Sequence, residues 1–157
     1  MNTAAVIGIR EQGALELILA LLRQGLTVRL RVSGISMLPL IQEGDVVEVT
    51  PLCEKKIRRG DIVFFCDHQG NPFIHRLHRL RYDSKVLHLQ TKGDACAGYD
   101  PAVPVNQVYG QVRRIIITDR KIITLQNPFS FWQSRFLVAR TAILFCLRRI
   151  KMVIIKE

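Results

Sequence analysis

The sequence has no apolar run long enough to span a lipid bilayer. A spanning helix needs ~18 or more apolar residues without interruption, whereas the nearest candidate, residues 136–147, has 12 residues and includes Arg140. The features of a cleavable secretory signal are also missing, because Glu16 interrupts the first apolar run and no basic n-region precedes it. We therefore expect a retained N-terminus and a protein that is cytoplasmic or peripherally associated with a membrane.

Cysteine pairs with metal-binding or redox spacing are absent as well. No C-x-x-C pair occurs among the four cysteines, Cys53, Cys66, Cys96 and Cys146. This spacing predicts neither a zinc knuckle nor a dithiol redox site. We expect buried free thiols, no metal site and no cofactor.

The length and composition indicate one folded domain with short additions. A chain of 157 residues leaves little room for a second full domain. Its 48% hydrophobic and 23% charged residues are ordinary for a globular protein. The net charge is +10, and residues 120–157 contribute +7 of it through eight basic residues and one acid. This excess makes an anionic membrane surface a candidate partner.

Residue patterns predict a mainly β fold with a helix at each end. Leucine and isoleucine recur at helical spacing over residues 11–24, and Gly25 follows where a C-terminal cap belongs. Residues 28–32 alternate in the manner of a half-buried strand. Further short strands are predicted up to residue 126, most of them antiparallel, in the β-branched or aromatic runs 46–49, 62–65, 86–90, 112–117 and 122–125.

After Pro128 the pattern becomes helical again. From Trp132 to Lys156, apolar residues recur at the spacing of one helical face, and basic residues are in excess over acidic ones. This segment is predicted either to lie on an anionic membrane surface or to dock on the β domain with its basic face in water. The expected organisation is an N-terminal helix over residues 1–26, a β domain over 27–126 and a basic amphipathic helix over 127–157.

A candidate nucleophile follows the first predicted strand. Ser36 comes just after the strand and two residues after Gly34, which allows a substrate backbone to approach closely. A serine hydroxyl is a poor nucleophile at neutral pH until a base accepts its proton. A serine in this setting is by itself more often a turn residue, so the assignment depends on the motifs that follow.

Those motifs occur in a defined order: Gly44-Asp45, Gly60-Asp61, His75-Arg76, Thr91-Lys92-Gly93-Asp94 and Asp100. Over roughly residues 28–112 this set resembles the type I signal peptidase family, in the branch of archaea and the endoplasmic reticulum where histidine replaces the lysine base. The resemblance implies the β fold shared by signal peptidases and LexA-like proteins. It also implies a serine endopeptidase that cleaves signal or leader segments after small residues.

The resemblance assigns roles to individual residues. Ser36 would be the nucleophile, His75 the general base and Asp100 the acid that orients the histidine, which are the three roles that serine catalysis requires. The supporting residues would be Asp94, Gly34, Met37, Pro39, Arg76, Lys92 and Gly93. Many signal peptidases have serine where this chain has Gly34, so the oxyanion would depend on backbone N–H groups, including that of Ser36.

Strand alternation separates the two histidines near this position. Within one strand we expect two faces, the first with Phe73, His75 and Leu77 and the second with Ile74, Arg76, His78 and Leu80. His78 would then face away from the serine, and the two histidines could not bind one metal ion. Asp45 and Asp61, which each follow a glycine, are predicted to hydrogen-bond their own turns.

Two other functions stay open. An autoproteolytic LexA-like regulator would share the fold, but those proteins use a lysine base, and residues 1–26 are too few for a preceding DNA-reading helix pair. A non-catalytic basic module that binds membrane or nucleic acid is compatible with the charge of +10. The presence of Ser36, His75 and Asp100 together argues that the chain has kept its catalytic function. We do not expect nucleic acid as a partner.

Overall fold

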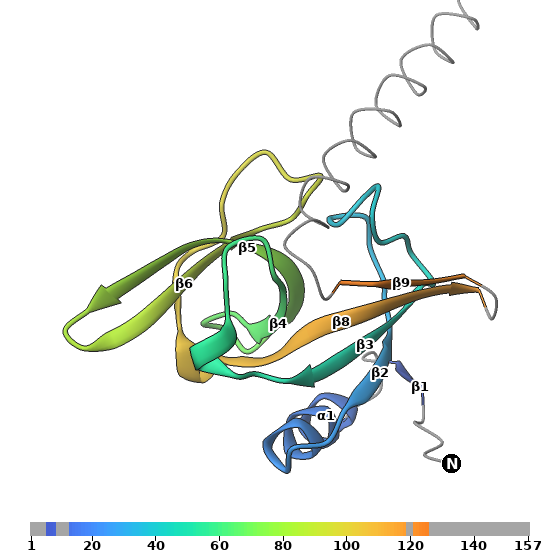
Figure 1. Ribbon diagram of the computed structural model, residues 1–157, viewed down its shortest axis with the longest axis horizontal. Coiled ribbons are helices and arrows are strands. Elements are labelled where there is room, and N and C mark those ends of the chain that lie inside the picture. Colours follow the sequence, from blue (N-terminus) through green and yellow to red (C-terminus); the bar gives the residue numbers. More distant parts are fainter. Residues whose placement is uncertain (1–5, 9–12, 119–120, 126–157) are drawn as a thin grey trace, which may run out of the picture. The chain divides into compact units, whose positions relative to one another are not determined.

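The structure is a computed structural model that describes residues 6–8, 13–118 and 121–125 (Figure 1). The described residues belong to one compact unit, Met1–Gln126. The predicted C-terminal helix over residues 127–157, together with Cys146, lies outside them. Within the described ranges, no helix is both long enough and apolar enough to cross a membrane.

The predicted N-terminal helix is observed as α1, Ala14–Arg23. It buries one face through residues four positions apart, which are Ala14, Ile18 and Leu22. The helix ends as predicted, because Gly25 adopts a left-handed φ of +85°. This turn lets the Leu26 N–H donate to the Leu21 carbonyl at 3.0 Å, which is the Schellman arrangement.

The β domain is a curled sheet, in which nine strands are described (Figure 1). The strands are β1 (Val6–Gly8), β2 (Val28–Arg31), β3 (Val46–Pro51), β4 (Ile62–Cys66), β5 (Pro72–Asp83), β6 (Val86–Lys92), β7 (Val103–Pro104), β8 (Val108–Thr118) and β9 (Lys121–Thr124). Two short 3₁₀ turns occur at Glu54–Lys56 and Val105–Gln107. The order is β1-β2-β3-β8-β4-β5-β6-β7, with β9 also on β8. Only β1 and β2 are parallel among these pairs, which confirms the predicted mainly antiparallel β fold.

Strand β4 forms the wall between two hydrophobic clusters. All five of its residues are buried, and successive side chains point to opposite faces. Phe64 packs in the cluster beneath α1, while Val63 and Phe65 pack in the cluster shared with β5 and β6. Both faces of this strand are covered, which explains why the run 62–65 is apolar throughout.

A β-bulge in β5 changes the predicted pattern of faces. Leu77 pairs with Thr91 and Arg79 with Gln90, so His78 is an extra residue without a partner on β6. The bulge reverses the alternation beyond it. Leu80 therefore packs against the same cluster as Leu77, and the prediction that these two leucines lie on opposite faces is wrong.

The cysteines follow the prediction only in part. Cys53, Cys66 and Cys96 are free thiols, but only Cys66 is buried. Cys53 is exposed because it precedes the 3₁₀ turn Glu54–Lys56 at the surface. Burial raises the pKa of the Cys66 thiol, and the neighbouring Asp67 carboxylate raises it further.

Gly110 is predicted to be essential for stability, because β8 passes close to β3 at this residue. A Cβ atom there would lie 2.5 Å from Val49 Cγ1 and 2.8 Å from the Thr50 carbonyl oxygen. Gly110→Ala should lower the free energy of unfolding by ~1–3 kcal/mol, measured as a lower urea midpoint. Gly98→Ala, where an added Cβ meets open space, is the control and should leave the midpoint nearly unchanged. Equal midpoints for the two variants would contradict this packing.

Candidate active site

The loop after β2 holds Ser36 between two fixed points. At its base, the Val32 N–H donates to the Asp45 carbonyl at 2.8 Å. In its middle, the Met37 side chain is buried in the core, as predicted for a packing residue. The half-buried Pro39 lies in the turn that the Ile41 N–H closes by donating to the Met37 carbonyl at 3.0 Å. Ser36 is therefore presented from an anchored turn.

Asp45 and Asp61 both accept a hydrogen bond from backbone three residues earlier, as predicted. The Gln42 N–H donates to Asp45 Oδ2 and the Arg58 N–H donates to Asp61 Oδ2, each at 2.8 Å. Burial raises the pKa of Asp61, and its hydrogen bond with the Arg58 N–H opposes that rise. Both aspartates therefore shape their own turns, and no hydrogen bond joins either of them to Ser36 within the described residues.

The His75 imidazole joins Ser36 to Asp100. Its Nε2 lies 3.0 Å from Ser36 Oγ, and its Nδ1 lies 2.7 Å from Asp100 Oδ2. Because a carboxylate can only accept, Nδ1 carries the proton and donates to Asp100. In the neutral ring Nε2 is then an acceptor, so the Ser36 hydroxyl donates to it. This is the tautomer in which histidine can take a proton from serine.

The surroundings of His75 fix the orientation of its ring. Its side chain is only 5% exposed, and it lies opposite Val63 in the pairing of β4 with β5. The rings of Phe73 and Phe65 stand beside it, with centroids 5.4 Å and 6.1 Å away. The imidazole therefore has little freedom to turn away from its two partners.

Thr91, to which the sequence motifs assigned no role, supports Asp100. The Thr91 hydroxyl donates to Asp100 Oδ2 at 2.7 Å, and the Asp100 N–H donates to the Thr91 carbonyl at 2.9 Å. Gln90 adds a third contact, from its amide to the Asp100 carbonyl at 3.3 Å. A signal existed in the sequence, because Thr91 continues the buried face of Leu87 and Leu89, where a hydroxyl needs a partner.

Gly93 lets the turn after β6 pack against Ser36. The Ala95 N–H donates to the Ser36 carbonyl at 2.9 Å. A Cβ atom on Gly93 would lie 2.7 Å from that same carbonyl oxygen and 2.7 Å from Cys96 Sγ. Only glycine therefore fits between the two segments without displacing one of them.

Asp94 is paired with Arg76 and not with His75. Arg76 Nε and Nη2 donate to the two carboxylate oxygens of Asp94 at 2.7 Å and 2.6 Å, and Nη1 donates to the Gly60 carbonyl at 2.9 Å. Both side chains are about nine-tenths buried, at 9% and 10% exposure. This ion pair holds the turn that contains Gly93, and Asp100 is left as the acid at the histidine.

Lys92 and His78 both lie at Tyr99. The Lys92 ammonium is 5.4 Å from the centre of the Tyr99 ring, and the His78 ring meets Tyr99 edge to face at 5.3 Å. Burial lowers the pKa of His78, and the positive charge of Arg76 lowers it further. Of the two histidines on this strand, the structure places His75 against Ser36.

Ser36 and His75 open into a cleft of about 360 Å³ between the loop after β2 and the start of β5. Gly34 lies in the cleft wall with a left-handed φ of +96°, and an added Cβ there would meet no neighbour. Phe73 forms part of the opposite wall, and Arg31 supplies a positive charge to the lining. Within the described part of the chain, no group of three or more metal-binding side chains comes together. The cleft can hold an extended peptide beside the Ser36 hydroxyl and the His75 imidazole.

Residues 4–97 match the family described as Peptidase S24-like, a span that includes Ser36 and His75 and ends before Asp100. No curated protein matches the chain significantly.

Gly93→Ala is predicted to disable the Ser36 hydroxyl without unfolding the domain. The new Cβ should push the Ser36 backbone away from His75, and a shift of ~1 Å can reduce reactivity ~10²-fold. The measurement is the rate of labelling by a fluorophosphonate probe, with circular dichroism as the check on folding. Gly98→Ala in the same loop is the matched control, because its Cβ enters open space. Equal labelling rates in both variants would refute the role given to Gly93.

Proposed function

The chain belongs to the peptidase S24-like family, and from this premise we propose that it is a serine endopeptidase. In this proposal Ser36 is the nucleophile, His75 the general base and Asp100 the acid that orients the base. The observation that supports it most is the continuous contact from Asp100 through His75 to Ser36, at 2.7 Å and 3.0 Å.

The first step is acylation of Ser36. His75 Nε2 accepts the hydroxyl proton while Ser36 Oγ attacks the scissile carbonyl carbon, which produces a tetrahedral oxyanion. Asp100 stabilises the imidazolium that forms, and the Thr91 hydroxyl at 2.7 Å keeps that carboxylate in place. Collapse of the intermediate breaks the C–N bond, and His75 gives its proton to the departing amine. The product is an ester between the substrate and Ser36.

The second step is hydrolysis of that ester. His75, neutral again, accepts a proton from water, the hydroxide oxygen attacks the ester carbonyl, and Ser36 regains its proton as the acid product leaves. We propose the Ser36 backbone N–H as an oxyanion donor in both steps, since Gly34 offers no side-chain hydroxyl. The open space at Gly34 lets the substrate backbone lie close to this N–H.

For the substrate, we propose a signal or leader segment with small residues before the cut. The support is the resemblance of the ordered motifs to the histidine-base signal peptidases, together with the modest cleft of about 360 Å³ beside Ser36. An autoproteolytic reaction with a lysine base is less well supported, because Lys92 lies over Tyr99 while His75 lies against Ser36.

We also propose that the basic segment of residues 127–157 brings the enzyme to an anionic membrane surface. Its support is sequence alone: most of the net positive charge of the chain lies from residue 120 onward, next to apolar residues at helical spacing. The proposed division is therefore an N-terminal helix, a catalytic β domain over residues 27–126 and this basic segment.

Replacement of the nucleophile or the base should abolish turnover. Ser36→Ala and His75→Ala are expected to lose nearly all kcat, at least ~10³-fold, in cleavage of a leader-bearing protein followed by mass spectrometry. His78→Ala and Lys92→Ala are the controls, and both should keep most of the activity because these side chains lie at Tyr99. The proposal fails if folded Ser36→Ala still cleaves, or if Lys92→Ala alone is inactive.

Replacement of Asp100 should impair catalysis, whereas replacement of Asp94 should impair stability. Asp100→Asn is expected to reduce kcat ~10³–10⁴-fold with little change in unfolding, because the amide favours the wrong histidine tautomer. Asp94→Asn should instead lower the free energy of unfolding by on the order of 3 kcal/mol, since it leaves the buried Arg76 guanidinium without its counter-charge. Kinetics and urea denaturation of both variants provide the comparison. The reverse pattern would show that Asp94 is the catalytic acid.

A further inference from the structure

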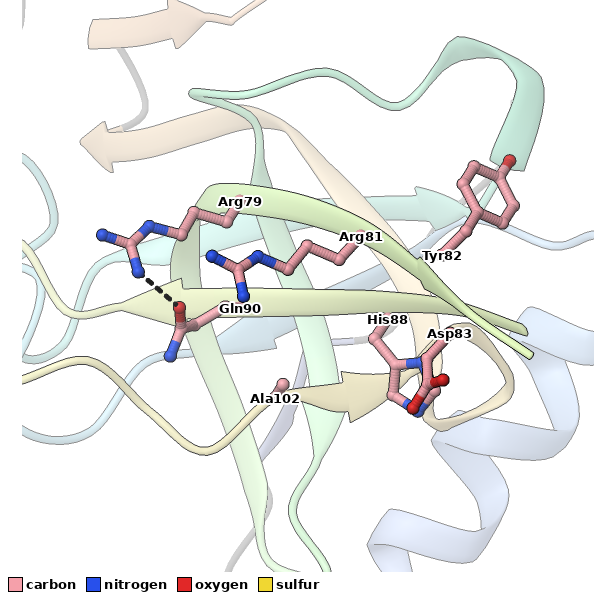
Figure 2. Close-up of a pocket in the computed structure, with 7 residues that line it drawn as sticks. All are labelled: Arg79, Arg81, Tyr82, Asp83, His88, Gln90 and Ala102. Carbon is pink, nitrogen blue, oxygen red and sulfur yellow. Dashed lines mark hydrogen bonds between the residues drawn. The ribbon is translucent and has the colours of Figure 1, made fainter. Parts of the chain in front are cut away.

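A second pocket lies on β5 and β6 beyond the bulge. It has a volume of about 420 Å³, and its lining includes Arg79, Arg81, His88, Gln90 and Ala102. Arg79 pairs with Gln90 and Arg81 with His88 across the two strands, so these side chains share one face of the sheet. In Figure 2 the two guanidinium groups extend in the same direction along this face.

The two arginines bring positive charge that the pocket does not neutralise. Arg79 is held in place by Gln90, whose Oε1 accepts from its Nη1 at 3.4 Å, and by Tyr99, whose ring centre is 4.9 Å from its Cζ. Arg81 is exposed and makes no ion pair within the described part of the chain. The one acid in the lining, Asp83, is the last residue of β5, and it forms no ion pair with either arginine.

We propose that this pocket binds an acidic peptide segment with carboxylates at alternate positions. Arg79 and Arg81 are two residues apart on one strand, which spaces their attachment points by ~6.6 Å. Alternate side chains of an extended peptide have the same spacing and point the same way. A Glu-x-Glu segment can therefore place one carboxylate at each guanidinium, and arginine is well suited to carboxylates because of its fork of donors.

An acidic peptide fits the pocket better than a single-stranded nucleic acid, which would offer phosphates at comparable spacing. Proteins that bind single strands combine positive charge with aromatic rings on which bases stack. The tyrosine of this lining is Tyr82, and Figure 2 shows its ring directed away from the two guanidinium groups. The Tyr99 ring beside Arg79 is already in contact with Arg79, Lys92 and His78. Carboxylates need no such platform.

The position of the pocket gives it a role as a substrate-binding exosite, a role that rests on the proposed peptidase function. Strand β5 carries His75 near its start and Arg79 and Arg81 further along, ~10–20 Å away at ~3.3 Å per residue. Because the bulge turns the two arginines to the face of β5 opposite His75, a substrate that reaches both sites must pass round the sheet and needs more residues than the roughly three to six of the straight path. Gln90 also joins the two sites, because it accepts from Arg79 and donates to the Asp100 carbonyl.

Binding can be tested separately from catalysis in the full chain with Ser36→Ala. The probes are fluorescein-labelled ten-residue peptides of identical composition, one with glutamates at alternate positions and one with adjacent glutamates, measured by fluorescence anisotropy. We expect the alternate peptide to bind about three-fold or more tightly than the adjacent one and to dissociate in ~0.5 M salt. Equal affinities would overturn the spacing argument and the proposal with it.

Variants in the same background locate the binding. Arg79→Gln with Arg81→Gln should weaken the alternate peptide ~10-fold or more, whereas Arg58→Gln with Arg59→Gln, an exposed pair outside the pocket, should change it less than two-fold. These double variants remove the same charge. An equal loss in both would reduce the effect to general attraction and overturn the proposal, as would tighter binding of a ten-nucleotide thymidine oligomer that depends on Arg79 and Arg81.

Cleavage assays distinguish the failure of this proposal from the failure of the peptidase function. If the wild-type chain cleaves nothing but the Ser36→Ala chain binds the alternate peptide through Arg79 and Arg81, the pocket binds acidic peptides but is not an exosite. If the wild-type chain cleaves leader peptides but the Ser36→Ala chain does not bind the alternate peptide, the peptidase function holds and the proposed binding of acidic peptides is refuted.

Discussion

The hydrogen bonds of the His75 ring are the constraint on which the rest of the site depends. Its two nitrogens must reach Ser36 Oγ and Asp100 Oδ2 at once, at 3.0 Å and 2.7 Å, and these oxygens belong to loops far apart in the chain. A rigid ring tolerates little error in either loop. The 2.9 Å hydrogen bond from Ala95 to the Ser36 carbonyl joins the two loops directly, and Gly93 permits their close approach.

The sheet provides the rigid frame for these loops. Strand β4 is buried on both faces, so it fixes β5, and with it His75, between two hydrophobic clusters. The bulge at His78 then reverses the faces of β5, with Leu80 directed to the second cluster. One strand thereby serves two different surfaces, the cleft at Ser36 and the basic pocket beyond the bulge.

The arginines at the two surfaces differ in whether they form an ion pair, and burial explains the difference. Near His75, Arg76 is about nine-tenths buried and donates two hydrogen bonds to the Asp94 carboxylate, because an unpaired buried charge would be costly. Beyond the bulge, Arg81 is exposed and needs no partner for stability. Its charge therefore remains free to attract an acidic ligand, which is the basis of the proposed exosite.

The sequence alone determined the features that depend on local pattern. The mainly β fold, the helix that ends at Gly25 and the turn bonds of Asp45 and Asp61 follow from neighbouring residues, and the ordered motifs selected the three side chains that meet at His75. Only the tertiary structure decided which residues face each other across strands. The hydroxyl of Thr91 on Asp100, the pairing of Asp94 with Arg76, the place of Leu80 and the pocket at Arg79 and Arg81 all depend on register and on one bulge. A single extra residue in a strand reverses every side chain after it, and no local pattern in this chain marked His78 as that residue.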